Sequence, residues 1–499
     1  MSMNVLSKSA LALALCGALY GQAQAEGTLT IGLEADPIGF NASKARLFNQ
    51  TTSNVALAVM EGLFAYDREG DIVPRLGLEL TESEDRMSAT VTLRQGVAFH
   101  DGTPFNADAV VAHYDWITSP GSGINTAMID PIDYVEKVDD YTVRFVLNQP
   151  WVALKSALAI DHMFNFIGSP TAVKEDPEGF HRHPVGTGPF TFQEWKSGER
   201  LVVTRNEDYW DGELPNVDEV VFRVLPDNDT RNQSLRAGEV DMTPVPTPAQ
   251  VVAAREDDSI AVHGYESSGA LSWNFHNRKA PFDDPAVRRA VIQSVNQDAL
   301  IKVFYQGTTV PTTGFFNADS PWRCEDLDWP SYNPDQVSKV LEEKGNIQFE
   351  HISTNTPAGR RLGGIFQHFF KEAGFDTKLE LLDQGQNIRA GLFGNYQMNI
   401  WRFVDFGGDP DLNLTSYLTS TVTRHDVEAY KPMLEQARAE TDTQKRKELY
   451  CDISRKFAED AIFMMPVQST YYVLASPKVK DVAPLRNNLV QLRDIRLEQ

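Results

Sequence analysis

Apolar and polar residues alternate one by one at several places in the first half of the chain, a pattern typical of strands with one buried face. A helix is expected between two of these strands, over residues 107–117, with Asn106 as its N-cap. The strands predicted from the alternation cover residues 27–35, 89–93, 142–147, 201–205 and 219–225.

The second half of the chain follows a helix-then-strand rhythm. Asp284-Pro285 and Asn333-Pro334 each open a helix, because proline is favoured at the first helical position. Apolar residues over 362–373 recur at helical spacing up to Gly374, and a strand is expected directly afterwards at 377–382. A last long helix begins near Asp442, and a late strand follows at 471–474. This order predicts the α/β class with a mostly parallel, helix-covered sheet.

The N-terminal residues have the pattern of a secretory signal peptide. Lys8 is followed by an uncharged apolar run over residues 10–20, and Ala23-Gln24-Ala25 supplies the small residues that signal peptidase needs. The run is shorter than the about 20 residues that a membrane-spanning helix requires. Leu15 precedes Cys16 where a lipoprotein signal has a small residue. We therefore expect cleavage after Ala25 and a protein that is free in the periplasm.

Composition and charge exclude several classes of function. The chain of 499 residues is long enough for more than one domain, and its formal charge of −23 disfavours binding to nucleic acid or anionic membranes. No segment after the signal is apolar enough to insert into a membrane. In an oxidising compartment Cys324 and Cys451 are candidates for a disulfide, with two buried free thiols as the alternative.

Sequence motifs for catalysis or metal binding are missing. The chain has no nucleophile elbow, zinc-protease motif, phosphate-binding loop or paired C-x-x-C motif. His181 and His183 could share one face of a strand, but a metal site needs further ligands and none is close in sequence. We expect no metal, no cofactor and no catalytic residue.

Six ordered motifs resemble those of the family 5 bacterial extracellular solute-binding proteins, the binding subunits of peptide, nickel and related ABC importers. The longest is residues 88–110, a strand, a turn at Asp101-Gly102 and a capped helix, and it follows a second motif at 61–76. The other four cover residues 184–190, 205–210, 232–241 and 277–290. Within the first of these four, the Gly-Pro-rich stretch 186–189 looks like a crossover between lobes.

The resemblance implies a fold of the periplasmic binding protein type, class II, in which two lobes joined by two crossovers close on a ligand. After the signal at 1–25, the first lobe is expected to be discontinuous and to contain residues 26–62, 186–276 and 470–499. Residues 63–185 would form an inserted domain, and residues 277–469 the other lobe. Ligand would lie between the first and last of these parts.

The best candidate for ligand binding is Asp405, expected at the C-terminal end of a strand over 400–403, where open α/β sheets bind ligands. It resembles the family Asp that pairs with the α-amino group of a peptide, although it could also be a turn carboxylate. Asp409 and Asp411 are interpreted as turn and cap residues.

Arg402 departs from the peptide binders, which carry Trp three residues before the key Asp, whereas this chain has Trp401 shifted by one position. Arg402 could bind a ligand carboxylate or pair with Asp405. Trp273 and Phe275 could stack on a ligand or pack in the core. Phe40-Asn41 matches a family position that lines the cleft.

The sequence therefore predicts a periplasmic binding protein, not an enzyme, that delivers a short peptide or peptide-like solute to an ABC permease and its ATPase. A monomer is sufficient for this role. The same role for a metal chelate, an opine or a sugar-derived compound is the alternative, with scattered histidines at 181, 183, 276 and 425. A periplasmic peptide hydrolase or chaperone is the alternative from a different class.

Overall fold

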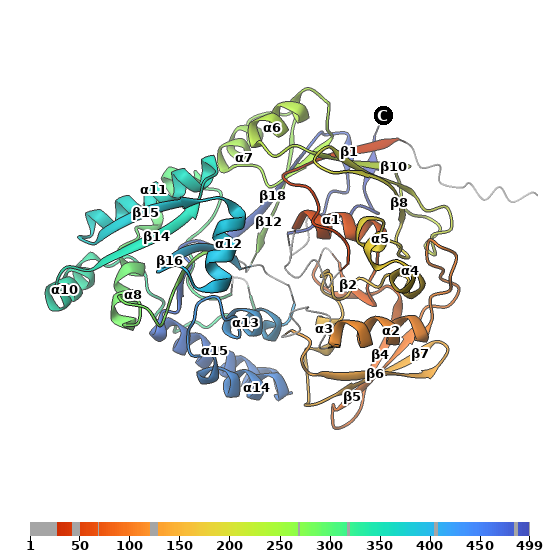
Figure 1. Cartoon of the computed structure of the whole chain (residues 1–499), viewed down its shortest axis with the longest axis horizontal. Helices are drawn as coiled ribbons and strands as arrows, with labels where there is room; N and C mark the ends of the chain where they lie inside the picture. Colours follow the sequence, from red (N-terminus) through yellow and green to blue (C-terminus); the bar gives the residue numbers. More distant parts are fainter. Residues whose placement is uncertain are drawn as a thin grey trace, which may run out of the picture.

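The computed structural model describes residues 27–41, 50–67, 69–119, 128–267, 270–316, 320–403, 408–483 and 488–498. The expected signal peptide at 1–25 lies outside these residues. The chain forms two lobes and a smaller domain, each built on its own sheet (Figure 1). None of the described helices is both long and apolar enough to cross a membrane.

The first lobe is built on a seven-stranded sheet. Its central strand β1 (Thr28–Leu33) pairs in parallel with β10 (Glu219–Val224) and β11 (Met242–Pro244), and the other pairings are antiparallel. The remaining strands are β12 (Ala261–Ser267), β18 (Ser469–Ala475), β9 (Arg200–Arg205) and β8 (Phe190–Lys196), in the order β12-β18-β11-β1-β10-β9-β8. The strands predicted at 27–35, 201–205 and 219–225 are confirmed as β1, β9 and β10.

Apolar residues of β1 drive this packing. Leu29, Ile31 and Leu33 are buried and belong to one apolar cluster with the buried helix α1 (Gln50–Val59). Helices α6 (Asn228–Arg236) and α7 (Pro248–Arg255) belong to the same lobe, and the short pair β19 (Val479–Lys480) and β20 (Arg496–Leu497) lies near its C-terminal end.

The inserted domain is built on a four-stranded antiparallel sheet, β4 (Gly77–Glu82), β5 (Ser88–Leu93), β7 (Thr142–Leu147) and β6 (Ile132–Asp139), covered by helix α2 (Ala107–Thr118). Asn106 caps α2 by accepting a hydrogen bond from the amide of Ala109, as the sequence predicts. The hairpin β2 (Phe64–Tyr66) and β3 (Ile72–Pro74) and the short helices α3 (Leu154–Ala157), α4 (Pro170–Glu175) and α5 (Pro177–Arg182) complete the region.

The second lobe is built on a five-stranded sheet in the order β15-β14-β16-β13-β17. Its strands are β15 (Asp376–Leu382), β14 (Gln348–Thr354), β16 (Met398–Phe403), β13 (Ala270–Phe275) and β17 (Phe463–Met464). The pairings β14–β15 and β14–β16 are parallel, whereas β13 pairs antiparallel with β16 and β17. The predicted mostly parallel sheet is therefore mixed, because β13, the strand through which the chain enters this lobe, runs against the other four strands.

Helices surround this second sheet. The amphipathic helix α11 (Pro357–Glu372) packs on β14 and β15 with Leu362, Phe366 and Phe370 buried. The other helices of the lobe are α8 (Pro285–Gln293), α9 (Gln297–Leu300), the π-helix η1 (Ile301–Tyr305), α10 (Pro334–Lys344), α12 (Gln384–Phe393), α13 (Pro410–Leu418), the 3-10 helix η2 (Val427–Ala429), α14 (Lys431–Ala439) and α15 (Thr443–Asp460).

Consecutive strands belong to different large sheets at two places in the chain, β12 followed by β13 and β17 followed by β18. The expected crossover at 186–189 is wrong, because this stretch leads from α5 of the inserted region to β8 of the first sheet and does not reach the second lobe. Its glycines are needed for close packing, since a Cβ at Gly186 or Gly188 would overlap the backbone of Val59. Strand β13 also belongs to the second sheet, although residues up to 276 are included in the expected first lobe.

A disulfide joins Cys324, in the loop before α10, to Cys451 of α15, with the two Cα atoms 5.5 Å apart. The disulfide expected from the sequence is thus confirmed. Near it, the guanidinium of Arg446 lies over the rings of Trp322 and Tyr450. The bond therefore fixes an irregular segment to the longest helix of the second lobe.

Replacing Cys324 and Cys451 together by serine should lower the free energy of unfolding by about 2–4 kcal/mol, because the bond closes a long loop of the unfolded chain. Denaturant unfolding of the mature protein measures this difference. Titration of thiols in the denatured, unreduced wild type should find none, and two free thiols would contradict the bond.

Acid should lower the stability of the folded protein through its buried histidines. Burial lowers the pKa of His113 and of His351 to about 4, below the usual value of about 6.5. The unfolded chain therefore binds more protons than the folded protein between these values. Stability should be complete above about pH 6.5 and should fall by roughly 2 kcal/mol per histidine at pH 5.

The difference in unfolding free energy between pH 7 and pH 5 measures this effect. In His113→Gln the difference should shrink by about 2 kcal/mol, whereas His368→Gln, at an exposed position of α11, should leave it unchanged. An undiminished difference in His113→Gln would show that this histidine is not the group responsible.

Candidate functional site

The C-terminal end of β16 is the region where the sequence predicts ligand binding. Strand β16 ends at Phe403, and α13 begins at Pro410 with Asp409 as its N-cap. Asp405 falls within residues 404–407, outside the described residues, so its role stays a prediction. The carboxylate of Asp409 receives a hydrogen bond from Nη2 of Arg446 at 2.7 Å, which agrees with the structural role expected for it.

Arg402 is exposed on β16 and forms no ion pair with a described residue. Burial raises the pKa of Tyr305 and of Tyr471, and the positive charge of Arg402 acts in the opposite direction on both. Tyr305 ends the π-helix of the second lobe, whereas Tyr471 lies on β18 of the first lobe. The guanidinium of Arg402 is therefore within electrostatic range of tyrosines from both lobes.

Glu34 brings a negative charge to the same region. It follows β1 directly, and its charge contributes to the raised pKa of Tyr471. Glu34 and Arg402 thus lie at the C-terminal ends of strands that belong to different sheets, the edges at which α/β proteins bind ligands. Sequence analysis missed Glu34, Tyr305 and Tyr471 because no motif marks them; only the position of Glu34 after the first strand could have suggested it.

Trp401 points to the opposite side of β16 from Arg402, because side chains alternate along a strand. It is half-buried against α12, where a Cβ at Gly391 would lie 2.7 Å from Cζ3 of the indole. Trp401 therefore packs between sheet and helix and does not share the position of Arg402.

Trp273 and Phe275 are core residues with no exposed surface. The Trp273 ring lies 4.8 Å from that of Phe366, and the Phe275 ring lies 4.7 Å from that of Phe282, measured between centroids. The structure thus supports the core-packing alternative for both residues.

Phe40 and Asn41 are also structural. Phe40 is buried with its ring centroid 5.7 Å from that of Trp195, in an edge-on arrangement. The side-chain amide of Asn41 donates to the carbonyl oxygen of Pro177 at 3.3 Å, at the start of α5. Both side chains attach the residues after β1 to neighbouring elements, and their place at a ligand stays a prediction.

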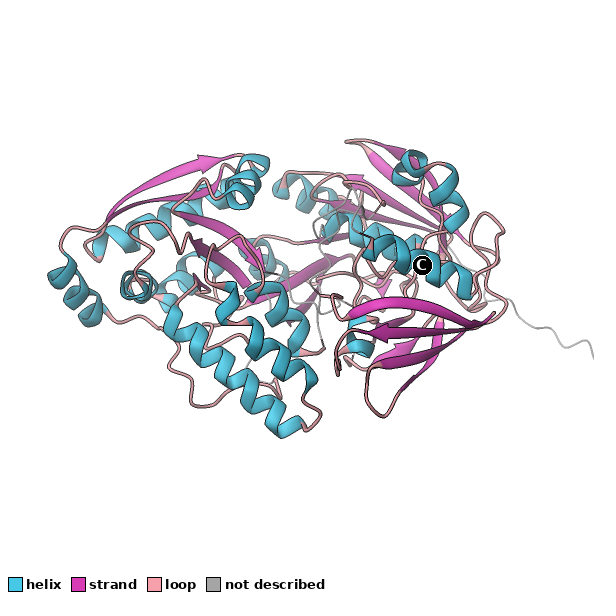
Figure 2. Cartoon of the chain, turned by 60° about the horizontal axis from the view of Figure 1, so that its bottom comes forward, coloured by secondary structure: helices cyan, strands magenta, loops and turns pink. Residues whose placement is uncertain are grey.

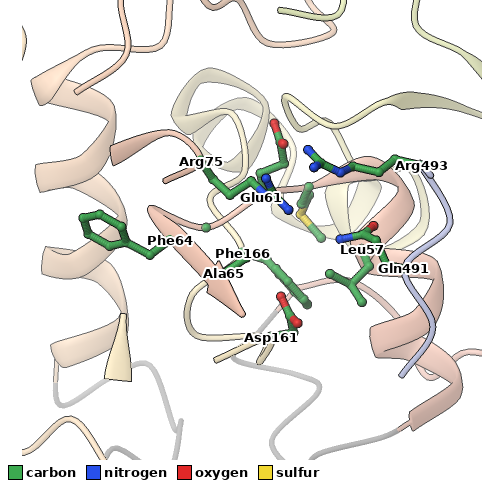
Figure 3. Close-up of a pocket in the computed structure, with 11 residues that line it drawn as sticks. Leu57, Glu61, Phe64, Ala65, Arg75, Asp161, Phe166, Gln491 and Arg493 are labelled. Atoms are coloured by element: carbon green, nitrogen blue, oxygen red, sulfur yellow. The ribbon is translucent and has the colours of Figure 1, made fainter. Parts of the chain in front are cut away.

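A small cavity lies where α1, β2 and the C-terminal segment meet (Figure 3). Arg75 and Arg493 point toward the buried carboxylate of Glu61 from opposite sides of the figure. Glu61 accepts hydrogen bonds from Tyr209 at 2.7 Å and Trp210 at 2.8 Å, and burial raises the pKa of its carboxyl group. The cavity volume of about 20 Å³ suits a single water molecule, so this polar cluster joins elements and cannot hold a peptide.

In the described part of the chain, no group of three or more His, Cys, Asp or Glu side chains could hold a metal ion. His181 lies on α5, where its Nδ1 approaches the backbone amide of Asn41 at 3.4 Å. His181 is thus part of the packing around the residues after β1, whereas the ring of His183 lies against that of Phe192 on β8.

Comparisons with known proteins agree with this architecture. The model of the family "bacterial extracellular solute-binding proteins, family 5 middle" matches residues 71–424. The dipeptide-binding protein of Escherichia coli strain K12 is 28% identical over 91% of each chain. A glutathione-binding protein of Pectobacterium atrosepticum is 32% identical over 67% of this chain and 66% of its own.

A solved structure has the same fold. The dipeptide-binding protein from Pseudoalteromonas sp. SM9913, in complex with Met-Leu, superposes with a TM-score of 0.85 at 21% identity, over 95% of this chain and 100% of that chain. The predicted fold of the periplasmic binding protein type is therefore confirmed.

Proposed function

Because the chain belongs to the family 5 bacterial extracellular solute-binding proteins, we propose that it captures a short peptide or peptide-like solute between its two lobes for import by an ABC transporter. The observation that carries the choice of ligand is the exposed guanidinium of Arg402, which has no ion pair with a described residue and lies within electrostatic range of groups from both lobes.

The charges around Arg402 suit a zwitterion. A guanidinium binds a carboxylate through two parallel hydrogen bonds, and Glu34 and the proposed Asp405 carry the charge that pairs with an ammonium group. Each charge must find a partner when the lobes exclude water, because an unpaired buried charge is strongly unfavourable. A ligand with both signs of charge satisfies this requirement, and a neutral ligand does not.

A ligand with more than one carboxylate is favoured. Peptide binders of this family carry a tryptophan three residues before the key Asp, where this chain has Arg402, which adds a positive charge. Among the relatives, some are named for binding glutathione, a peptide with two carboxylates and one ammonium group, and another for dipeptides. We therefore propose a small acidic peptide of the glutathione type as the ligand, ahead of an ordinary dipeptide.

The role is transport and not catalysis. The proposed site needs groups that bind charge, and the two lobes would close on the ligand as a shift toward the conformation that it prefers. We place the mature protein in the periplasm, after cleavage at Ala25, as a monomer that passes its ligand to a permease and its ATPase.

The ligand class is tested by mass spectrometry of small molecules released from denatured protein and by calorimetry with glutathione and with Met-Leu. We expect a peptide with an additional carboxylate to be recovered intact and glutathione to bind more tightly than Met-Leu. Hydrolysis of the added peptides would overturn the transport role, and tighter binding of Met-Leu would overturn the preference for an acidic ligand.

Arg402→Ala should raise the Kd for glutathione by about tenfold to a hundredfold, since a hydrogen bond to a charged group contributes roughly 1.5–3 kcal/mol. Asp405→Ala should abolish binding of amine-bearing ligands without affecting folding. Lys339→Ala on α10, at the outer edge of the same lobe (Figure 1), removes an equal charge and should leave the Kd unchanged. An unaltered Kd in Arg402→Ala would exclude this residue from the site.

A further inference from the structure

The inserted domain also contacts the second lobe, away from the strands at which the two lobes are connected. Figure 1 shows β12 and β18 at the upper side of the molecule and α13 and α14 facing α3 at the lower side. Figure 2 brings this lower side forward, with α13, α14 and α15 beside the four-stranded sheet. The inserted domain and the second lobe are thus in contact across the space that separates the lobes.

Trp151, in the loop between β7 and α3, is the centre of this contact. Its indole is 1% exposed, and its Nε1 donates a hydrogen bond of 2.8 Å to Oδ2 of Asp411 on α13. The amide of Val152 donates to the carbonyl oxygen of Arg438 on α14 at 3.2 Å. Leu412, fully buried, packs into the apolar cluster of the inserted domain.

The second lobe also comes close to the hairpin β2–β3 of the inserted region. A Cβ at Gly408, directly before α13, would overlap the phenol oxygen of Tyr66 on β2. Glycine at this position therefore permits the loop before α13 to reach the inserted domain. Four separate stretches of the chain, two from the inserted region and two from the second lobe, are thus packed together here.

The negative charge of Asp411 is paired within the second lobe, without Trp151. Nε of Arg438 lies 3.0 and 3.2 Å from its two carboxylate oxygens, and the hydroxyl of Thr415 donates to Oδ1 at 3.0 Å. Nη2 of Arg438 completes the network by donating to Thr415 at 2.9 Å. These bonds lie within the second lobe and can persist when the lobes separate, so only the Trp151 and Val152 bonds must break.

We propose that Trp151 is a closure latch, an anchor that docks on the Asp411–Arg438 pair when the lobes close and is released to water when they open. The proposal rests on lobe closure as part of the proposed function. A docked indole buries a large apolar surface and donates to a charged acceptor, and both contributions exist only in the closed form. The latch therefore raises the closed population and with it the apparent affinity, without touching the ligand.

The test compares Trp151→Phe with Trp116→Phe in the mature protein. Trp151→Phe keeps an aromatic ring but removes the hydrogen bond to Asp411. Trp116 lies on α2 of the same domain, and its described packing is with the clusters of the inserted domain and first lobe. For Trp151→Phe we expect a dissociation rate and a Kd for glutathione roughly tenfold higher, corresponding to one lost hydrogen bond to a charged group, with both values unchanged in Trp116→Phe.

A purely structural contact would give a different result. In that case Trp151→Phe would lower the melting temperature of the ligand-free protein while the Kd measured well below it stayed the same. That outcome, or equal shifts of Kd in both variants, would overturn the latch.

A second measurement needs no ligand, so it separates failure of the latch from failure of the proposed function. Hydrogen exchange of the Val152 amide reports directly on the interlobe bond, with the Val143 amide in β7 as an internal reference. Ligand-free Trp151→Phe should exchange at Val152 at least fivefold faster than wild type, with Val143 unchanged. Equal exchange at Val152 would overturn the latch, and absence of glutathione and Met-Leu binding alongside faster exchange would overturn only the ligand class.

Discussion

The arrangement of the two lobes depends on one pairing constraint. Strand β12 pairs with β18 in the first lobe, and β13 pairs with β17 in the second lobe, both antiparallel. The chain leaves the first sheet after β12 and returns to it at β18, so the strands that precede and follow the junction between the lobes are paired neighbours in both sheets. Connections at one pair of neighbouring strands favour rotation of the lobes about this junction, which is the motion that the proposed capture of a ligand requires. The proposed ligand site and the latch at Trp151 both depend on this geometry.

Burial of charge divides the ionisable groups into two kinds. Glu61 and Asp411 are buried and Asp409 is nearly so, and all three have hydrogen-bond donors around them, as expected for carboxylates with little access to water. Arg402 is the contrasting case, since it is exposed and has no ion pair with a described residue. A protein that must capture a charged solute needs such a group, because a cation already paired inside the protein would have to break that pair before it could bind a ligand's charge.

Much of the fold could be predicted from the sequence, because strands and helices follow from local periodicity and caps. The α2 helix with its Asn106 cap and the buried alternation of β1 are examples. The errors arose where local patterns do not specify the partner. A Gly-Pro-rich stretch at 186–189 signals a close backbone approach, but the approach is to Val59 of α1 and not to the other lobe. Trp273 and Phe275 carry aromatic rings suited to stacking on a ligand, yet the direction of the strand points them into the core.

The sequence by itself determined the elements, the family and the order of the motifs, because these depend on residues close together in the chain. It also indicated the acidic segment after β16 and the unusual Arg402. Only the tertiary structure brought Glu34 and Tyr471 of one lobe toward Arg402 of the other. It likewise joined Trp151 to Asp411, 260 positions apart in the chain. Such contacts depend on how separate sheets are placed in space, and that placement is set by the sum of many packing contacts, which no short pattern encodes.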